Sequence, residues 1–228
     1  MPKKLSKRLQ SIANLVPKNS YIADIGSDHA QLPIYLCETG TVSWAQAVEN
    51  KTGPFLRMTH AIQESGLEGH IDCSRSDGIS DLNEGVDTVL ICGMGGMLAC
   101  DILEAHTEKL FHVQTIIVDP HKDLVSVRKR VTALGYKIDE ETMVYEDKIF
   151  YTIIRFVKTD VAVDYSRSDL LFGPILRKKR GETFEDWLKI QLKHVNDILN
   201  LNLPREKRDY YLDLYRIIRD EKNRTNVA

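Results

Sequence analysis

The sequence has no long hydrophobic run, and proline is scarce. None of its apolar runs approaches the roughly 20 residues that a membrane-spanning helix needs. Only 7 of the 228 residues are prolines and 43% are apolar, which excludes collagen-like and disordered architectures. The basic N-terminal segment contains neither an apolar core nor a small-residue cleavage site, so we expect no secretory signal. These absences predict a cytoplasmic globular protein that binds no membrane.

Cysteine is also sparse, and its spacing matches no metal site. The four cysteines are Cys37, Cys73, Cys92 and Cys100, and no two of them form a CxxC pair. In a chain without an export signal we expect reduced thiols, not disulfides or zinc ligands. The seven histidines are scattered, with no pair at ligand spacing. We therefore expect no metal.

The formal net charge is only −2, but it is unevenly distributed. Residues 1–160 hold 17 basic against 22 acidic side chains, a net of −5, and residues 161–228 hold 14 against 11, a net of +3. A basic tail on an acidic body is weakly indicative of a polyanionic partner. A solvated helical surface explains the same charge equally well.

Strand-like and helix-like segments alternate over the first 158 residues. Five short apolar segments are expected as strands: 21–25, 41–48, 70–74, 88–92 and 115–119. Helical patterns lie between or after them at 31–38, 54–65, 97–105 and 124–134. This order predicts an α/β fold with a mostly parallel sheet and helices on both faces. Two further strands, 136–145 and 149–157, are separated by a link that permits only an antiparallel hairpin. The arrangement resembles Rossmann-like class I methyltransferases.

Both ends of the chain carry helical patterns outside this alternation. Residues 6–16 form an amphipathic pattern with basic residues on its polar side. Beyond residue 160 the strand signal disappears, and apolar stripes predict one helix before Pro204 and another after it. Two consecutive helices joined at a proline predict an antiparallel helical hairpin.

The strongest local motif follows the first strand, where Asp24-Ile-Gly26-Ser27-Asp28-His29-Ala leads into a helix. Gly26 permits a sharp turn and a close approach of ligand to backbone. The dinucleotide pattern GxGxxG is absent, and the anionic Asp28 would repel a pyrophosphate. Acidic groups suit a cationic ligand such as S-adenosylmethionine, which has a sulfonium and an ammonium group. The alternative is an ordinary strand–helix turn with solvent-facing Asp28 and His29.

The ends of the next two strands offer weaker candidates. Glu49 lies 23 residues after Gly26, near the spacing at which a carboxylate binds the ribose hydroxyls of an adenosine. Asp77-Gly78 follows the third strand, where the aspartate could accept from an adenine amine. A plain Asp-Gly turn is at least as probable there.

The fourth and fifth strands end in a glycine cluster and an ionisable pair. Cys92-Gly93-Met94-Gly95-Gly96 has three glycines in four positions, which costs stability and indicates backbone passing close to a ligand. Cys92 itself is more readily explained as a buried structural thiol. The fifth strand ends Asp119-Pro-His121, whose side chains are candidates to meet the substrate. A strand exit before a helix would favour similar residues.

Taken in order, these motifs resemble the bacterial tRNA (adenine-22-N1)-methyltransferase (TrmK) family. The resemblance rests on Leu5-Ser-Lys-Arg8-Leu, Asp24–Ala30, Gly53-Pro54, Asp77-Gly78, Gly93–Gly96 and Gly173-Pro174-x-Leu176, and it covers nearly the whole chain. It implies S-adenosyl-L-methionine as donor and a D-loop adenine of tRNA as acceptor. It also implies a methyltransferase domain over residues 1–160 and a helical, coiled-coil-like extension over 161–228. The family's fifth strand commonly ends Gln-Pro-Asn, so Asp119 and His121 replace amides with ionisable groups.

Motifs and resemblance together predict three groups of site residues. The expected cofactor-binding residues are Asp24, Gly26, Ser27, Asp28, His29, Glu49, Asn50, Asp77, Gly78, Cys92, Gly93 and Met94. The expected catalytic residues are Asp119 and His121. The expected tRNA-binding residues are Arg8, Gly95, Gly96, Arg177, Lys178, Lys179 and Arg180, with Lys3, Lys4 and Lys7 as further candidates. The partner would be tRNA, and the protein a monomer or weak dimer.

Neutral adenine N1 already has a lone pair, so methyl transfer needs alignment of the reactants and no prior deprotonation. Asp119 would supply a negative field for the adenine as it becomes cationic. Two other classes of function stay open. One is methylation of another RNA, of DNA, of a protein or of a small molecule. The other is a non-catalytic adaptor that binds nucleoside or RNA; an NAD-linked oxidoreductase is disfavoured by the missing glycines.

Overall fold

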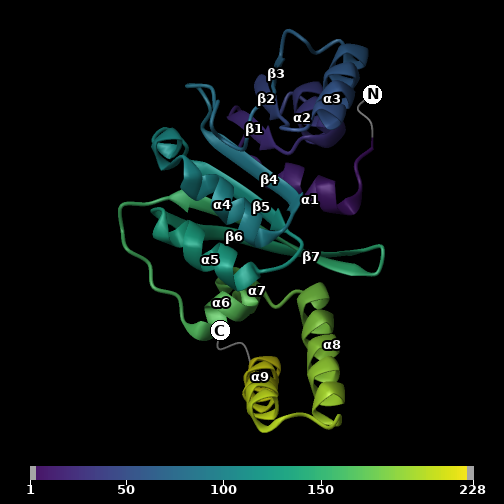
Figure 1. Ribbon diagram of the computed structural model, residues 1–228, viewed down its shortest axis with the longest axis vertical. Helices are drawn as coiled ribbons and strands as arrows, with labels where there is room; N and C mark the ends of the chain where they lie inside the picture. The colour runs from purple at the N-terminus through teal and green to yellow at the C-terminus, as the bar shows by residue number, and fades with distance from the viewer. Residues whose placement is uncertain (1–3, 225–228) are drawn as a thin grey trace. The chain divides into compact units, whose positions relative to one another are not determined.

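The structure is a computed structural model that describes residues 4–224. Its chain separates into two compact units whose boundary falls between Asp164 and Tyr165. The N-terminal unit is built on a sheet and the C-terminal unit is helical (Figure 1). Within residues 4–224, no helix is long and apolar enough to cross a membrane.

The N-terminal unit contains a seven-stranded sheet in the order β3-β2-β1-β4-β5-β7-β6. The strands are β1 (Tyr21–Ile25), β2 (Trp44–Val48), β3 (Ile71–Ser74), β4 (Thr88–Met94), β5 (Thr115–Pro120), β6 (Tyr136–Glu146) and β7 (Ile149–Lys158). The first five are parallel, whereas β7 runs antiparallel to both β5 and β6. The predicted fold class, a mostly parallel Rossmann-like sheet with a terminal antiparallel hairpin, is confirmed.

The strand order reverses between β1 and β4, which both leave the sheet toward the same edge. In open α/β sheets, ligands bind outside the carboxyl ends of the strands at such a reversal. The topology therefore places the loops after β1, β2 and β4 around one crevice.

Helices cover the sheet and bury its apolar residues. They are α1 (Lys7–Leu15), α2 (Gln31–Glu38), α3 (Thr52–Ser65), α4 (Gly96–Ala105) and α5 (Leu124–Ala133), with short 3₁₀ turns η1 (Asp28–Ala30) and η2 (Thr107–Leu110). Ser6 caps α1 by accepting a hydrogen bond from the Leu9 amide at 3.2 Å. Each helix of the parallel part begins near the position that the sequence predicts.

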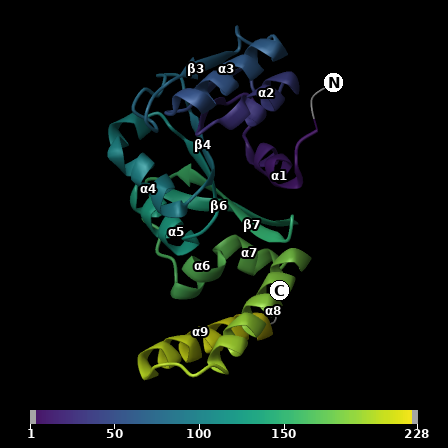
Figure 2. The same cartoon turned by 45° about the vertical axis from the view of Figure 1, so that its right-hand side comes forward.

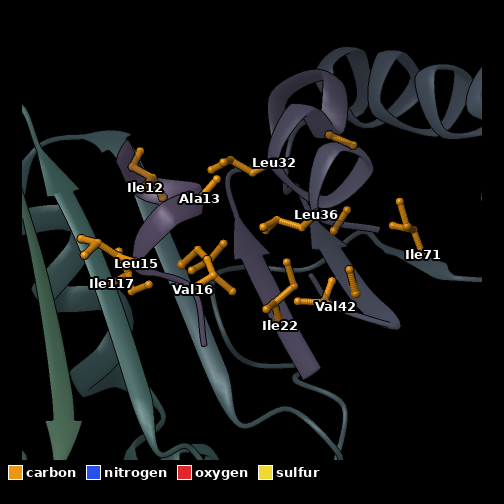
Figure 3. Close-up of a cluster of buried hydrophobic side chains, with 14 of the residues drawn as sticks. Ile12, Ala13, Leu15, Val16, Ile22, Leu32, Leu36, Val42, Ile71 and Ile117 are labelled. Carbon is orange, nitrogen blue, oxygen red and sulfur yellow. The ribbon is translucent and has the colours of Figure 1, made fainter. Parts of the chain in front are cut away.

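One continuous core lies between α1, α2 and the sheet (Figure 3). Ile12 of α1 and Leu36 of α2 are fully buried against Ile22 of β1 and Ile117 of β5. Burying an aliphatic side chain of this size stabilises the fold by roughly 1.5–3 kcal/mol. This core fixes α1 over the central strands, so the first residues of that helix have a defined place beside the crevice.

Within residues 165–224, the C-terminal unit has four helices where the sequence predicts two. They are α6 (Arg167–Phe172), α7 (Pro174–Lys179), α8 (Glu182–Leu199) and α9 (Arg205–Asn223). The two long helices pack against each other, as both ribbon views show (Figures 1 and 2). The short helices were not predicted, because six residues are too few to show an apolar period. Their signals are local: Ser166 and Asp169 form a capping box, and Pro174 opens α7.

Candidate functional site

A cavity of about 390 Å³ lies outside the carboxyl ends of β1, β2 and β4. This volume is in the range of small-molecule sites. Its wall combines loop glycines, polar residues and a few aliphatic side chains: Ile25, Gly26, Asp28, Val48, Glu49, Asn50, Lys51, Pro54, Ser76, Asp77, Gly78, Gly93, Met94, Leu98 and Ile102. We call it the donor cavity. The structure therefore has a cavity where the strand order predicts a ligand-binding crevice.

Gly26 turns the chain at the floor of this cavity with φ +76°, a conformation that favours glycine. A Cβ there would lie 3.0 Å from the Met94 methyl carbon, so a side chain would also crowd the loop after β4. The amides of Gly26 and Ser27 both donate to the Val48 carbonyl, at 2.9 and 3.0 Å. These two N–H groups are already hydrogen-bonded within the fold, so they do not offer donors to phosphate oxygens.

Carboxylates give the donor cavity its charge. Glu49 accepts a hydrogen bond from the Lys51 amide at 2.9 Å, and Asp77 accepts one from the Asn50 side chain at 3.2 Å. Asp28 pairs with Arg57 of α3 at 3.3 Å, and more than half of its side chain stays exposed. Acidic groups beside a loop whose Gly26 and Ser27 amides are already hydrogen-bonded suit a cationic nucleoside. The residues present therefore fit S-adenosylmethionine.

The structure brings eight of the twelve predicted cofactor residues onto the cavity wall: Gly26, Asp28, Glu49, Asn50, Asp77, Gly78, Gly93 and Met94. The other four lie off this wall. Asp24 and Ser27 are buried beneath the loop, and Cys92 is partly buried on β4. His29 lines a separate hollow of about 550 Å³ between the start of α1, α2 and α3.

The predicted glycine cluster divides into two roles. Gly93 sits in a β-bulge, since Cys92 pairs with Asp119 and Met94 pairs with Pro120, and its φ is +75°. Gly96 is buried in the first turn of α4, where a Cβ would lie 2.5 Å from the Lys122 carbonyl oxygen. Gly93 thus faces the cavity, whereas Gly96 is required by packing.

Asp119 ends β5 in an unusual environment. Its side chain is only 1% exposed, and neither carboxylate oxygen has a hydrogen-bond partner among the described residues. Its counter-ion is Arg8, whose Nη1 lies 3.5 Å from Asp119 Oδ2. The Arg8 guanidinium also lies 5.0 Å from the ring centre of Tyr151. We call these residues the Asp119 cluster.

His121 links the Asp119 cluster to the donor cavity. Its Nε2 forms a hydrogen bond of 2.8 Å with the Gly93 carbonyl, for which the Nε2–H tautomer must donate. The same Gly93 lines the donor cavity. A single bulged residue of β4 therefore lies between the donor cavity and the predicted catalytic residues.

Burial shifts the titration of the acids around this bulge. Desolvation raises the pKa of Asp119, and Arg8 followed by His121 opposes that shift. Burial raises the pKa of Asp24 to about 6. Burial, followed by the nearby Asp119 and Asp24, raises the pKa of the Cys92 thiol well above its usual value. Cys92 is therefore a neutral thiol at physiological pH and no nucleophile.

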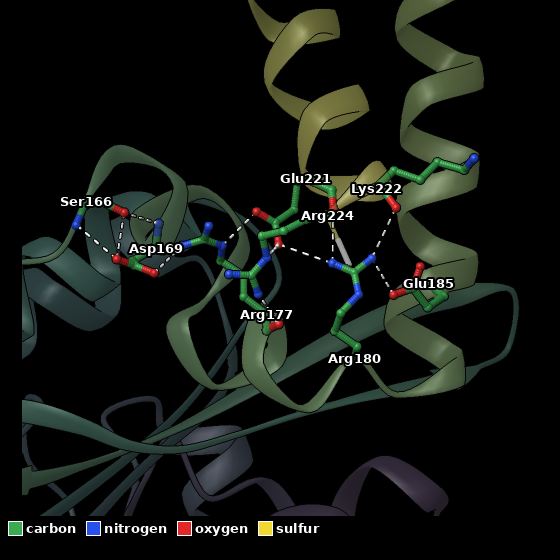
Figure 4. A network of polar contacts seen from close by, with 8 residues as sticks. All are labelled: Ser166, Asp169, Arg177, Arg180, Glu185, Glu221, Lys222 and Arg224. Atoms are coloured by element: carbon green, nitrogen blue, oxygen red, sulfur yellow. Dashed lines mark hydrogen bonds and ion pairs between the residues drawn. The ribbon is translucent and has the colours of Figure 1, made fainter. Parts of the chain in front are cut away.

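Two of the predicted tRNA-binding arginines are committed to a network inside the C-terminal unit (Figure 4). Arg177 pairs with Asp169 and, at 2.8 Å, with Glu221. Arg180 pairs with Glu185 at 2.6 Å and with Glu221 at 3.4 Å. Both arginines are largely buried, whereas Lys178 and Lys179 between them are exposed. The two arginines of this basic run therefore belong to the ion-pair network, whereas the two lysines are exposed.

Arg8, Lys4 and Lys7 lie in the described N-terminal unit, whereas Lys3 lies outside the described residues. Arg8 is three-quarters buried against Asp119 and Tyr151. Gly95 is half-buried, with the Lys122 side chain 3.7 Å from a Cβ built on it. Within residues 4–224, no group of three or more His, Cys, Asp or Glu side chains is placed to hold a metal ion.

Two residues of the site were missed from the sequence: Arg57 and Tyr151. Tyr151 had a usable signal, because an antiparallel β7 must place its first residues beyond the carboxyl end of β5. Arg57 had none, because its contact with Asp28 depends on how α3 packs against the loop after β1.

Comparisons with known proteins identify the class of protein. Residues 5–154 match a family model described as a methyltransferase domain. The protein is therefore a methyltransferase-domain protein.

Relatives define the family more narrowly. The Bacillus subtilis tRNA (adenine(22)-N(1))-methyltransferase is 35% identical over 201 residues, which are 86% of this chain and 84% of the relative. The chain belongs to the family of that enzyme.

Two solved structures share the fold over the whole chain. A Streptococcus pneumoniae putative tRNA (m1A22) methyltransferase, in complex with S-adenosyl-L-methionine, is 29% identical with a TM-score of 0.89, covering 96% of this chain and 100% of that one. The M. capricolum TrmK, in complex with S-adenosyl-homocysteine, is 26% identical with a TM-score of 0.86, covering 97% and 99%. The fold includes the C-terminal helices in both.

Proposed function

We propose that this protein transfers the methyl group of S-adenosyl-L-methionine to N1 of adenine 22 of tRNA. One observation carries the proposal: Gly93 lines the donor cavity and is hydrogen-bonded to His121, which lies beside the Asp119 cluster. The chain that has this arrangement belongs to the family described above. The donor name and the substrate come from the relatives described above.

The donor cavity supports binding of a nucleoside with a cationic side chain. Glu49 sits at the end of β2, where a carboxylate accepts from ribose hydroxyls. Asp77 and Asn50, already hydrogen-bonded to each other, offer acceptor and donor atoms to an adenine edge. Asp28 places negative charge near the loop after β1, where it favours an ammonium or sulfonium group. When bound, the donor supplies an electrophilic methyl group on a positively charged sulfur.

The Asp119 cluster supports binding of the acceptor. The adenine N1 lone pair forms the new N–C bond as the S–C bond breaks, so positive charge passes from sulfur to the adenine ring. A carboxylate fixed in a water-poor site stabilises such charge more strongly than one in water. Neither Asp119 oxygen accepts a hydrogen bond from the described residues, so both can accept one from the exocyclic amine of the base. We assign Asp119 to this role and His121 to holding the Gly93 carbonyl beside it.

Binding of tRNA would combine base extrusion with phosphate contacts. A D-loop adenine must leave its folded surroundings to reach a buried carboxylate. Lys7 begins α1 and Lys4 shortly precedes it, close to Arg8 of the Asp119 cluster, where these two cations can meet the flanking phosphates. In the C-terminal unit the exposed Lys178 and Lys179 have the same chemistry. We place the protein in the cytoplasm with its substrate, as a monomer or weak dimer.

The direct test is incubation with unmodified tRNA and methyl-labelled donor, followed by nuclease digestion and mass spectrometry of the nucleosides. We expect 1-methyladenosine, located at position 22 by sequencing of the labelled fragment. A tRNA transcript with guanosine at position 22 is the matched control and should take up no label. Label on another nucleoside would assign a different substrate, and failure to bind the donor in calorimetry would refute the methyltransferase assignment.

A further inference from the structure

The tip of the β6–β7 hairpin is fastened to the N-terminus of α1 by one side chain. Glu146, the last residue of β6, accepts hydrogen bonds from the Lys7 amide at 2.7 Å and from the Arg8 amide at 3.2 Å. The first amides of a helix have no partner within the helix, and their positive end favours an anion. These contacts lower the pKa of Glu146, which is therefore ionised at neutral pH. The carboxylate thus fixes the first turn of α1.

The same hairpin also supplies a surface for the Arg8 side chain. Tyr151 of β7 pairs in register with Val144 of β6, two residues before Glu146. The Arg8 guanidinium lies over the Tyr151 ring and 3.5 Å from Asp119 Oδ2. The hairpin therefore binds Arg8 twice, through its backbone at Glu146 and through its side chain at Tyr151.

We propose that Glu146 is a positioning residue for the methyl-acceptor side of the site, because it holds Arg8 between Asp119 and Tyr151. The inference rests on the proposed function, in which Asp119 acts on the acceptor. Glu146 touches neither the donor cavity nor Asp119 and acts through the helix that carries Arg8.

The electrostatic consequence follows from the groups that face Asp119. These are Arg8 from α1, His121 after β5, Cys92 of β4 with Asp24 of β1 behind it, and the uncharged Tyr151 of β7. Arg8 is the cation that most opposes the effect of burial on Asp119. If the first turn of α1 loosens, Arg8 spends less time beside Asp119, and the pKa of Asp119 rises. Methylation should then lose activity on the acidic side of its pH profile first.

The kinetic test is a double-mutant cycle on methylation of tRNA, with Glu146→Ala, Arg8→Ala and the combined variant. We expect Glu146→Ala to lower kcat about 10-fold or more and to move the acidic limb of the kcat profile to higher pH. Glu146→Gln keeps one acceptor oxygen and should recover part of the activity. The combined variant should be no slower than Arg8→Ala alone, because both substitutions remove one function. Asp147→Asn, at the exposed neighbouring turn residue, is the matched control and should match wild type.

Two measurements without tRNA separate this inference from the proposed function. Amide hydrogen exchange at residues 7–10 should speed up in Glu146→Ala and less so in Glu146→Gln. A ¹³C titration of the Asp119 carboxyl should show a higher pKa in Glu146→Ala than in wild type, with S-adenosyl-homocysteine affinity unchanged within about 2-fold. Unchanged exchange and titration, or additive losses in the double-mutant cycle, would overturn the positioning role. A wild-type protein that methylates no tRNA, with both shifts observed, would overturn the proposed function alone.

Discussion

Asp119 in the N-terminal unit and Glu221 in the C-terminal unit are both almost fully buried, but they have very different partners. Glu221 forms ion pairs with Arg177, Arg180 and Arg224, and its surroundings are saturated with donors. Asp119 forms an ion pair with Arg8 at 3.5 Å, and its oxygens accept no hydrogen bond among the described residues.

The contrast separates a structural carboxylate from a functional one. A buried charge that is fully paired stabilises the arrangement of its partners, and removing it leaves them uncompensated. A buried charge left short of partners costs stability and is retained where a ligand completes its hydrogen bonds. By this criterion Glu221 has a structural role in the C-terminal unit, and Asp119 fits the substrate-binding role proposed above.

The largest effect is expected from Glu221→Ala. The change leaves Arg177 and Arg180 buried without their shared acceptor and should lower the free energy of unfolding by about 3–5 kcal/mol. Thermal unfolding followed by circular dichroism measures the loss. Asp186→Asn, at an exposed pair with Lys189 on α8, is the control and should leave Tm unchanged. A small change for Glu221→Ala would remove the distinction drawn between the two carboxylates.

Asp119→Asn should act on turnover and spare the fold. The amide keeps the shape and loses the charge, so kcat for tRNA methylation should fall about 100-fold. S-adenosyl-homocysteine affinity, measured by calorimetry, should stay within about 2-fold of wild type, since Asp119 lies off the donor cavity wall. In wild type, kcat should decline as the pH falls through the raised pKa of Asp119, because protonation removes the negative charge. Equal activity of the variant would remove Asp119 from the mechanism.

Asp24 is a third buried acid, and it forms no ion pair with an arginine among the described residues. Its pKa is about 6 in the folded protein against 3.8 for an ordinary aspartate, so the folded state binds more protons between these values. Its contribution to stability is therefore fully present below pH 3.8 and is lost as the pH rises through about 6. The shift corresponds to at most about 3 kcal/mol.

Asp24→Asn should remove this pH dependence. Denaturant unfolding from pH 4 to pH 8 should show the variant gaining stability relative to wild type as the pH rises. A constant difference across that range would show that Asp24 keeps its ordinary titration in the fold.

The smallest effect is expected from Lys178→Ala. Lys178 is exposed on α7 beside the committed Arg177, so its loss should leave Tm unchanged and weaken tRNA binding slightly. If it contacts a phosphate, the slope of log affinity against log salt should fall by about 1. Filter binding across a salt series measures that slope. An unchanged slope would place the tRNA contacts elsewhere.

The sequence was sufficient for the regular parts of the fold. Each parallel strand is short, apolar and bounded by turn residues, so β1 and α2 begin and end where their patterns predict. The cavity-lining positions after β1, β2 and β4 followed from the rule that parallel strands end at one edge. Helices α6 and α7 were missed because two short turns carry caps but no period.

Side-chain partners were beyond sequence reasoning, for a physical reason. Residues 177–180 form one basic run in the sequence, but Arg177 on α7 and Arg180 at its left-handed C-cap pair with acidic side chains, whereas the two lysines between them are exposed. Arg8 likewise looks like a surface cation in an amphipathic pattern, yet it pairs with Asp119. Arg177 and Arg180 pair with Glu221, 44 and 41 residues away in the chain, and Arg8 pairs with Asp119, so these partners depend on tertiary packing.

The bulge at Gly93 has a consequence for how the two substrates bind. Its carbonyl accepts a hydrogen bond from His121 while its backbone lines the donor cavity, so one residue borders both the donor cavity and the proposed acceptor side. If either ligand displaces that residue, reciprocity requires that each alters the affinity of the other by the same factor. Binding of the donor and binding of tRNA would then be thermodynamically linked through a single glycine residue.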